Sequence, residues 1–168
     1  MQVTWIAAAF ARDLKSLKRE VAAYPDEAHL WSCPAGVTNS GGNLALHLAG
    51  NVQYFIGTLL GSSGYVRNRD AEFSRKGVPR AEVLREIDAA LAALQLGLGR
   101  ISEGDLGRPY PAPIGGQQLT IGDALLHLVT HLTYHVGQVD YHRRIVTGRN
   151  TAVGTVPVTE MATAKPTN

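Results

Sequence analysis

The stretch of this sequence from Ala28 to Val66 contains no aspartate, glutamate, lysine or arginine. Its helix-like part, LALHLAGNVQYFIGTLL, is too short and too rich in histidine, asparagine and glutamine to be a good membrane-spanning segment. A helix without a charged side needs to be covered over most of its circumference. In a chain of 168 residues a partner subunit is an expected cover, so this stretch predicts an oligomer.

Four segments have the length and apolar pattern of bundle helices, and turn or capping residues separate them. They run from about Val3 to Ala23, from Asn39 or Ser40 to about Leu60, from Pro79 to about Ile101, and from Ile121 to about Val146. A long polar connection, YVRNRDAEFSRKG, joins the second to the third. Gly-Gly at 115–116, between short β-friendly runs, predicts a small hairpin before the fourth.

The chain shows neither an alternating strand–helix rhythm nor an internal repeat. The pattern therefore predicts an all-α fold, a single four-helix bundle over residues 1–148, followed by a flexible tail over 149–168.

The bulk composition excludes several classes of function. The net charge is only +2, and the basic residues are spread along the chain, which argues against a nucleic-acid-binding surface. The single cysteine, Cys33, excludes an intramolecular disulfide, and no activating partner for it is visible in the sequence. The N-terminal MQVTWIAAAF lacks the basic start of a signal peptide. We therefore expect a soluble, cytoplasmic protein that binds neither nucleic acid nor membrane.

The segment HLVTHLTYH places histidines at 127, 131 and 135, on one face of the fourth helix. This face rises about 12 Å over eight residues, so one ion cannot bind all three. On a helical wheel, His131 and His135 lie closer to the apolar face than His127 does, so this pair is better aimed into the bundle. The spacing matches the H-E-x-x-H metal motif, but Leu132 replaces the general-base glutamate, which excludes that class of protease.

His47 lies in the second helix at the edge of its apolar face. If the second and fourth helices are neighbours, His47, His131 and His135 bring three nitrogen donors together with an open fourth position. That ligand number is typical of a catalytic metal site rather than a closed structural one. The alternative is a metal-free bundle with a histidine-lined pocket, in which each histidine hydrogen-bonds a neighbour.

NLALHLAGN around His47 and the H-x-x-x-H-x-G-Q pattern of HLTYHVGQ at 131–138 resemble the DinB-like superfamily of metal-binding four-helix bundles. The resemblance covers residues 1–147. It implies that His47, His131 and His135 bind a divalent metal, commonly nickel or zinc, and that the protein is a homodimer. Some members transfer low-molecular-weight thiols such as bacillithiol, mycothiol or glutathione, and others have no known activity, so the fold alone does not settle the reaction.

Other residues are candidates for supporting the metal ligands or lining a substrate pocket. Asn51 and Gln138 lie one turn beyond His47 and His135, where they could hydrogen-bond a ligand nitrogen or bound solvent. Tyr54 is a candidate pocket residue or core filler. His127 is a candidate supporting residue, or a partly exposed polar side chain.

The polar connection holds a second group of candidates. Arg67, Arg69, Asp70 and Glu72 could fold over the site and bind an anionic substrate, or they could pair with one another on the surface. Asp123 is a candidate general base, or a first-turn acid that complements the helix dipole.

The expected function is that of a metal-dependent thiol transferase, in which a metal-bound thiolate attacks a small electrophile. The alternatives are a metal-dependent hydrolase, which would need a general base, and a non-catalytic dimer that binds metal or a ligand. The sequence assigns no catalytic residue.

Overall fold

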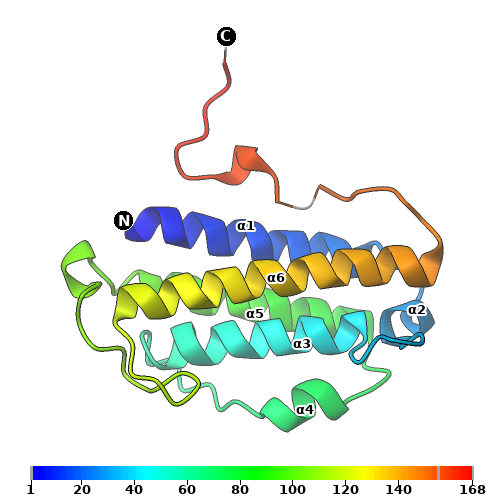
Figure 1. The fold of residues 1–168 in the computed structure, drawn as a ribbon, viewed down its shortest axis with the longest axis horizontal. Helices are drawn as coiled ribbons and strands as arrows, with labels where there is room; N and C mark the ends of the chain where they lie inside the picture. The colour runs from blue at the N-terminus through cyan, green and yellow to red at the C-terminus, as the bar shows by residue number, and fades with distance from the viewer. Residues whose placement is uncertain (1, 155, 168) are drawn as a thin grey trace.

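The computed structural model describes residues 2–154 and 156–167, and its named elements within these ranges are all helices (Figure 1). Six are α-helices: α1 (Val3–Ala22), α2 (Glu27–Trp31), α3 (Gly41–Val52), α4 (Arg69–Ser74), α5 (Arg80–Leu98) and α6 (Ile121–Thr147). A π-helix (Gln53–Thr58) extends α3, and short 3₁₀ turns occupy Glu103–Asp105 and Val158–Glu160. None of the described helices is both long enough and apolar enough to cross a membrane.

The four long helices α1, α3, α5 and α6 form the bundle, which confirms the predicted fold class. Helices α1 and α3 each pack against both α5 and α6, so apolar faces meet in one core (Figure 1). Ser40 and Thr120 cap α3 and α6 by accepting hydrogen bonds from backbone N–H groups of the first turn.

The connections before and after α3 each contain a short helix that the sequence pattern did not indicate. Asp26 caps α2 and Asn68 caps α4. Five or six residues are too few to show a helical period, so only the caps could have indicated them. The predicted hairpin is present as two isolated bridges, with Gly115 and Gly116 at positive φ in the turn between Ile114 and Gln117.

The burial of α3 explains why the stretch around it carries no charged side chain. Each of its residues is buried, and the cover comes from α1, α2, α4, α5 and α6 of the same chain. The uncharged helix therefore does not require a partner subunit, and the homodimer stays a prediction.

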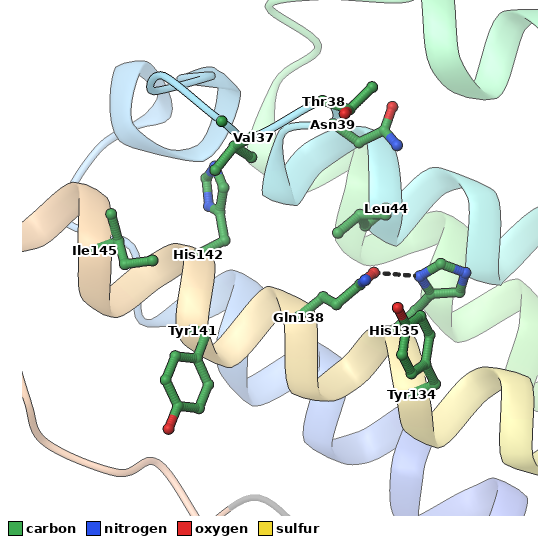
Figure 2. Close-up of a pocket in the computed structure, with 11 residues that line it drawn as sticks. Val37, Thr38, Asn39, Leu44, Tyr134, His135, Gln138, Tyr141, His142 and Ile145 are labelled. Atoms are coloured by element: carbon green, nitrogen blue, oxygen red, sulfur yellow. Dashed lines mark hydrogen bonds between the residues drawn. The ribbon is translucent and has the colours of Figure 1, made fainter.

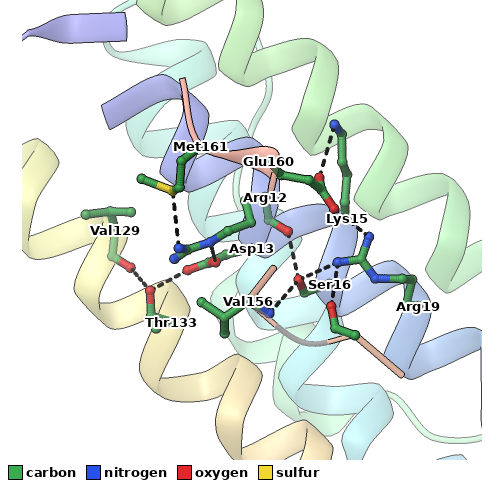
Figure 3. A network of polar contacts seen from close by, with 11 residues as sticks. Arg12, Asp13, Lys15, Ser16, Arg19, Val129, Thr133, Val156, Glu160 and Met161 are labelled. Atoms are coloured by element: carbon green, nitrogen blue, oxygen red, sulfur yellow. Dashed lines mark hydrogen bonds and ion pairs between the residues drawn. The ribbon is translucent and has the colours of Figure 1, made fainter. Parts of the chain in front are cut away.

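Side chains of α1 contact Gly154, Val156, Glu160 and Met161 of the C-terminal segment (Figure 3), and Figure 1 shows the last described residues leading away from the bundle. Arg19 donates to the Gly154 carbonyl at 2.9 Å and pairs with Glu160 at 3.0 Å. Arg12 reaches the Met161 sulfur at 3.3 Å and also bonds Asp13, which is buried and accepts a hydrogen bond from Thr133 of α6. The segment is thus joined to the contact between α1 and α6, and its predicted flexibility stays a prediction.

Candidate metal centre

The three predicted histidines converge where α3 packs against α6. His47 is buried in the middle of α3, and His131 and His135 are half-buried on successive turns of α6. One potential ligand atom from each lies within 4.8 Å of the other two. The three side chains therefore lie close enough to hold a metal ion, and the predicted convergence is confirmed.

The nitrogen positions fit a single ion. The Nε2 atoms of His47 and His131 are 3.3 Å apart. Two nitrogens bound to one ion at about 2.0–2.1 Å with tetrahedral angles would be about 3.3–3.4 Å apart. Within the part of the chain that the structure describes, the buried Nδ1 of His131 has no hydrogen-bond partner. A metal bound at Nε2 of His131 would not satisfy this Nδ1, so no acceptor among the described residues fixes the tautomer of that ring.

The protonation states also suit metal binding. Burial, together with smaller effects of the neighbouring histidines and Arg67, lowers the pKa of His131 to about 4. Burial also lowers the pKa of His135, against a smaller opposing effect of its hydrogen bond to Gln138. Both rings are therefore neutral near pH 7, the form in which imidazole binds a metal.

Glu72, from α4, orients His47. Its Oε2 lies 2.9 Å from Nδ1 of His47, so this nitrogen donates to the carboxylate and Nε2 keeps a free lone pair directed at His131. Arg67 holds both Glu72 oxygens, at 2.7 and 2.8 Å. Burial would raise the pKa of Glu72, but the hydrogen bonds from His47 and Arg67 outweigh burial and lower it. A charged, buried carboxylate therefore supports His47.

Because Arg67 is paired with Glu72, it is not free to bind an anionic substrate, the role considered for it from the sequence. The guanidinium donates two hydrogen bonds to one carboxylate and lies over the Phe55 ring. The Arg67–Glu72 pair does fold against the site, but as a closed pair rather than as a free cation. Asp70, which lies on α4 with Glu72, is exposed.

Gln138 supports His135 in the way its position predicts. Its Oε1 lies 2.6 Å from Nδ1 of His135, as the dashed line in Figure 2 shows. Because Oε1 accepts, Nδ1 carries the proton and Nε2 of His135 is left to bind a metal.

The remaining candidates lie outside this arrangement. Asn51 is buried, but none of the described hydrogen bonds joins it to a site histidine, because Glu72 takes the Nδ1 of His47. Tyr54 lies in the π-helix and contacts Phe55. A π-helix has more residues per turn than an α-helix, so a helical wheel drawn for an α-helix does not give the direction of the Tyr54 side chain.

His127 is exposed, with its ring 6.3 Å from that of His131, and it is outside the ligand group. Asp123 is exposed and bonds the Thr120 hydroxyl at the start of α6, as a first-turn acid does.

Gly50 is a site residue that sequence reasoning missed. It lies one turn after His47, and a Cβ atom placed on it would be 2.3 Å from Oε1 of Glu72. Only glycine therefore lets the carboxylate approach α3 closely enough to reach His47. The signal was the glycine in LHLAGN, on the same face of the helix as the histidine.

The substitution Gly50→Ala is expected to weaken divalent-metal affinity by about tenfold, because it displaces Glu72 from His47. Titration of the metal-free protein with zinc in the presence of a competing chelator measures this change. Gly137→Ala is the control, since a Cβ at that exposed position of α6 has no atom within 4 Å. Equal affinities for the two variants would contradict the role given to Gly50.

Metal-free protein is expected to lose stability as the pH falls from 6.5 toward 4. A histidine in the unfolded chain binds a proton below about 6.5, whereas folded His131 does so only at about 4. Between pH 4 and 6.5 the unfolded state thus holds more protons than the folded state, so the free energy of unfolding rises with pH in this window. The contribution of His131 reaches its full value above pH 6.5. Thermal unfolding in a chelating buffer measures the slope.

Buried His142, whose pKa burial also lowers, contributes in the same direction, so a matched variant is needed. His131→Gln should make the dependence on pH shallower. An unchanged slope in that variant would show that His131 does not titrate as described.

Comparisons with known proteins agree with the helical architecture. A family model described as "Protein of unknown function (DUF1572)" matches residues 3–160. No curated protein matches the chain. Among solved structures, a conserved protein from Enterococcus faecalis is similar, with a TM-score of 0.68 and 19% sequence identity over 89% of this chain and 99% of that one. At this identity the likeness shows the fold alone.

Proposed function

This chain belongs to the DUF1572 family, and we propose that it is a DinB-like protein that binds one divalent metal ion, nickel or zinc, through His47, His131 and His135. The observation that carries the proposal is the meeting of three imidazoles within 4.8 Å of one another. Hydrogen bonds to Glu72 and Gln138 support it, because they leave the Nε2 atoms of His47 and His135 free to bind.

We propose that the bound ion activates a low-molecular-weight thiol for attack on a small electrophile. When bound, such an ion leaves a coordination position at which it can stabilise a thiolate or polarise a substrate oxygen. The protein's own residues hold the ligand rings in place, and Phe73 packs against the His47 ring at 4.8 Å between centroids.

The surroundings favour thiol transfer over hydrolysis. Activation of water benefits from a nearby general base. Among the described carboxylates, Glu72 alone contacts a site histidine, and Arg67 already holds both of its oxygens. A thiol has an ordinary pKa of about 8.5, far below that of water, so a thiol that binds the ion can release its proton to solvent without a protein base. A metal-dependent hydrolase and a non-catalytic binding dimer remain the alternatives.

Elemental analysis of protein purified without a histidine tag tests the metal site. We expect one divalent ion per chain in the wild type and its loss in His131→Ala. His127→Ala is the control, because His127 lies on the same helix and outside the ligand group. An absence of stoichiometric metal, or an unchanged metal content in His131→Ala, would refute the proposal.

Thiol consumption with a panel of electrophiles tests the reaction. The rate is expected to depend on added metal and to fall to background in His47→Ala. A rate that does not depend on metal would rule out the transferase while leaving the metal site intact.

A further inference from the structure

A pocket of about 450 Å³ adjoins the metal centre, between α6 and the loop that precedes α3 (Figure 2). His135 and Gln138 form the end of this pocket nearest the metal centre. Its other walls come from the loop, from Leu44 and from the α6 side chains Tyr134, Tyr141 and Ile145. The volume is within the range of about 300–1,000 Å³ that is usual for small-molecule sites.

Among the described residues, no side chain that lines the pocket is an acid, a lysine or an arginine. The lining residues include two tyrosines and several aliphatic side chains. Arg67, the nearest predicted anion binder, is held by Glu72 through two hydrogen bonds. The guanidinium of Arg144 lies over the Tyr141 ring at the far end of the pocket, but it is already bonded to Asp140. An ionised group in this pocket would therefore lose hydration without gaining an unpaired partner of opposite charge.

Gln138 offers the pocket a directed hydrogen-bond donor. Its Oε1 faces the Nδ1 proton of His135, and this contact fixes the orientation of the amide. Among the described contacts, Nε2 of Gln138 makes no hydrogen bond, so its N–H groups remain available to an acceptor in the pocket. A carbonyl, epoxide or amide oxygen would satisfy that donor.

We propose that this pocket binds the body of the small-molecule substrate, and that this substrate is uncharged, with an aromatic or aliphatic group and an oxygen acceptor for Gln138. The inference rests on the proposed function, since the reacting end of the same molecule lies at the metal centre. It assigns the electrophile to the neutral, apolar class rather than to the anionic class that the Arg67–Glu72 pair had suggested.

Binding to cobalt-substituted protein tests this assignment without an activity assay. The absorption of bound cobalt reports ligation by two probes that share a metal-binding head, acetohydroxamate and benzohydroxamate. The aromatic ring should make benzohydroxamate bind about tenfold more tightly, because it buries apolar area against Tyr134, whose ring lies 5.2 Å from that of His135, and Leu44. A carboxylate on the ring, in 4-carboxybenzohydroxamate, should remove most of that gain.

Two exposed α6 positions provide the matched variants. Tyr134→Ala should bring the ratio of the two affinities close to one while leaving acetohydroxamate binding unchanged. Leu126→Ala should keep the wild-type ratio, because Leu126 is exposed but does not line the pocket. A ratio near one in the wild type, or a ratio that Tyr134→Ala does not change, overturns the pocket assignment while cobalt binding upholds the metal site. A missing cobalt spectrum overturns the proposed function, and the pocket assignment with it.

Discussion

The substitution Arg143→Ala is expected to lower the free energy of unfolding by about 3 kcal/mol, at the low end of the range for breaking a buried ion pair. Arg143 is 1% exposed and donates to Glu20 of α1 at 2.6 Å and to Asp140 at 3.1 Å. Removing its guanidinium leaves two buried carboxylates with less compensation. The effect stays near the low end because Arg144 also bonds Asp140.

Chemical denaturation of the metal-free protein, with the midpoint and slope both fitted, measures the change. Arg144→Ala is the matched control. It removes the same charge from the adjacent residue and from the same acceptor, but its side chain is 32% exposed, so less than about 1 kcal/mol is expected. Similar losses in the two variants would mean that net charge, rather than the buried pair, decides the effect.

The substitution Glu72→Gln is expected to weaken divalent-metal affinity by about 10–100-fold. A neutral amide holds the His47 Nδ1 proton less strongly than the carboxylate does, so His47 becomes a weaker and less well-oriented ligand. The same change leaves the guanidinium of Arg67 near the site without its counter-charge, and this adds repulsion toward a cation.

Competition titrations with zinc and with nickel measure this loss. Asp70→Asn serves as the control, because it removes one negative charge from an exposed position of the same short helix. A Glu72→Gln affinity within twofold of the wild type would show that Glu72 serves the fold rather than the metal centre. Removing Arg67 as well, in Glu72→Gln with Arg67→Met, should recover the part of the loss that is due to repulsion.

The four bundle helices and the histidine trio could be predicted because each depends on local periodicity. Apolar spacing gave the helices, and the four-residue interval gave His131 and His135 a common face. The choice of His47 needed one further assumption, that α3 and α6 are neighbours, and their packing confirms it. Gln138 could also be predicted, from its spacing to His135.

The contact of Glu72 with His47 could not be predicted, because it joins distant segments of the chain. Glu72 lies in a polar connection whose short helix has no readable period, and its partner His47 is 25 residues earlier. Asn51 was expected beside His47 on spacing alone, which could not show that another helix fills that position. Tyr54 lies where the backbone widens into a π-helix, so spacing rules for an α-helix could not decide between its two candidate roles.

The packing of the first helix against the last has a consequence for synthesis on the ribosome. Helix α1 emerges first, yet its buried Asp13 and Glu20 bond Thr133 and Arg143 of α6. The metal centre has the same requirement, since His47 and His131 are 84 residues apart in the chain. A nascent chain that ends before α6 therefore leaves the α6-facing side of α1 uncovered, and it lacks two of the three imidazoles. Under the proposed function, metal capture therefore needs α6 and follows its synthesis.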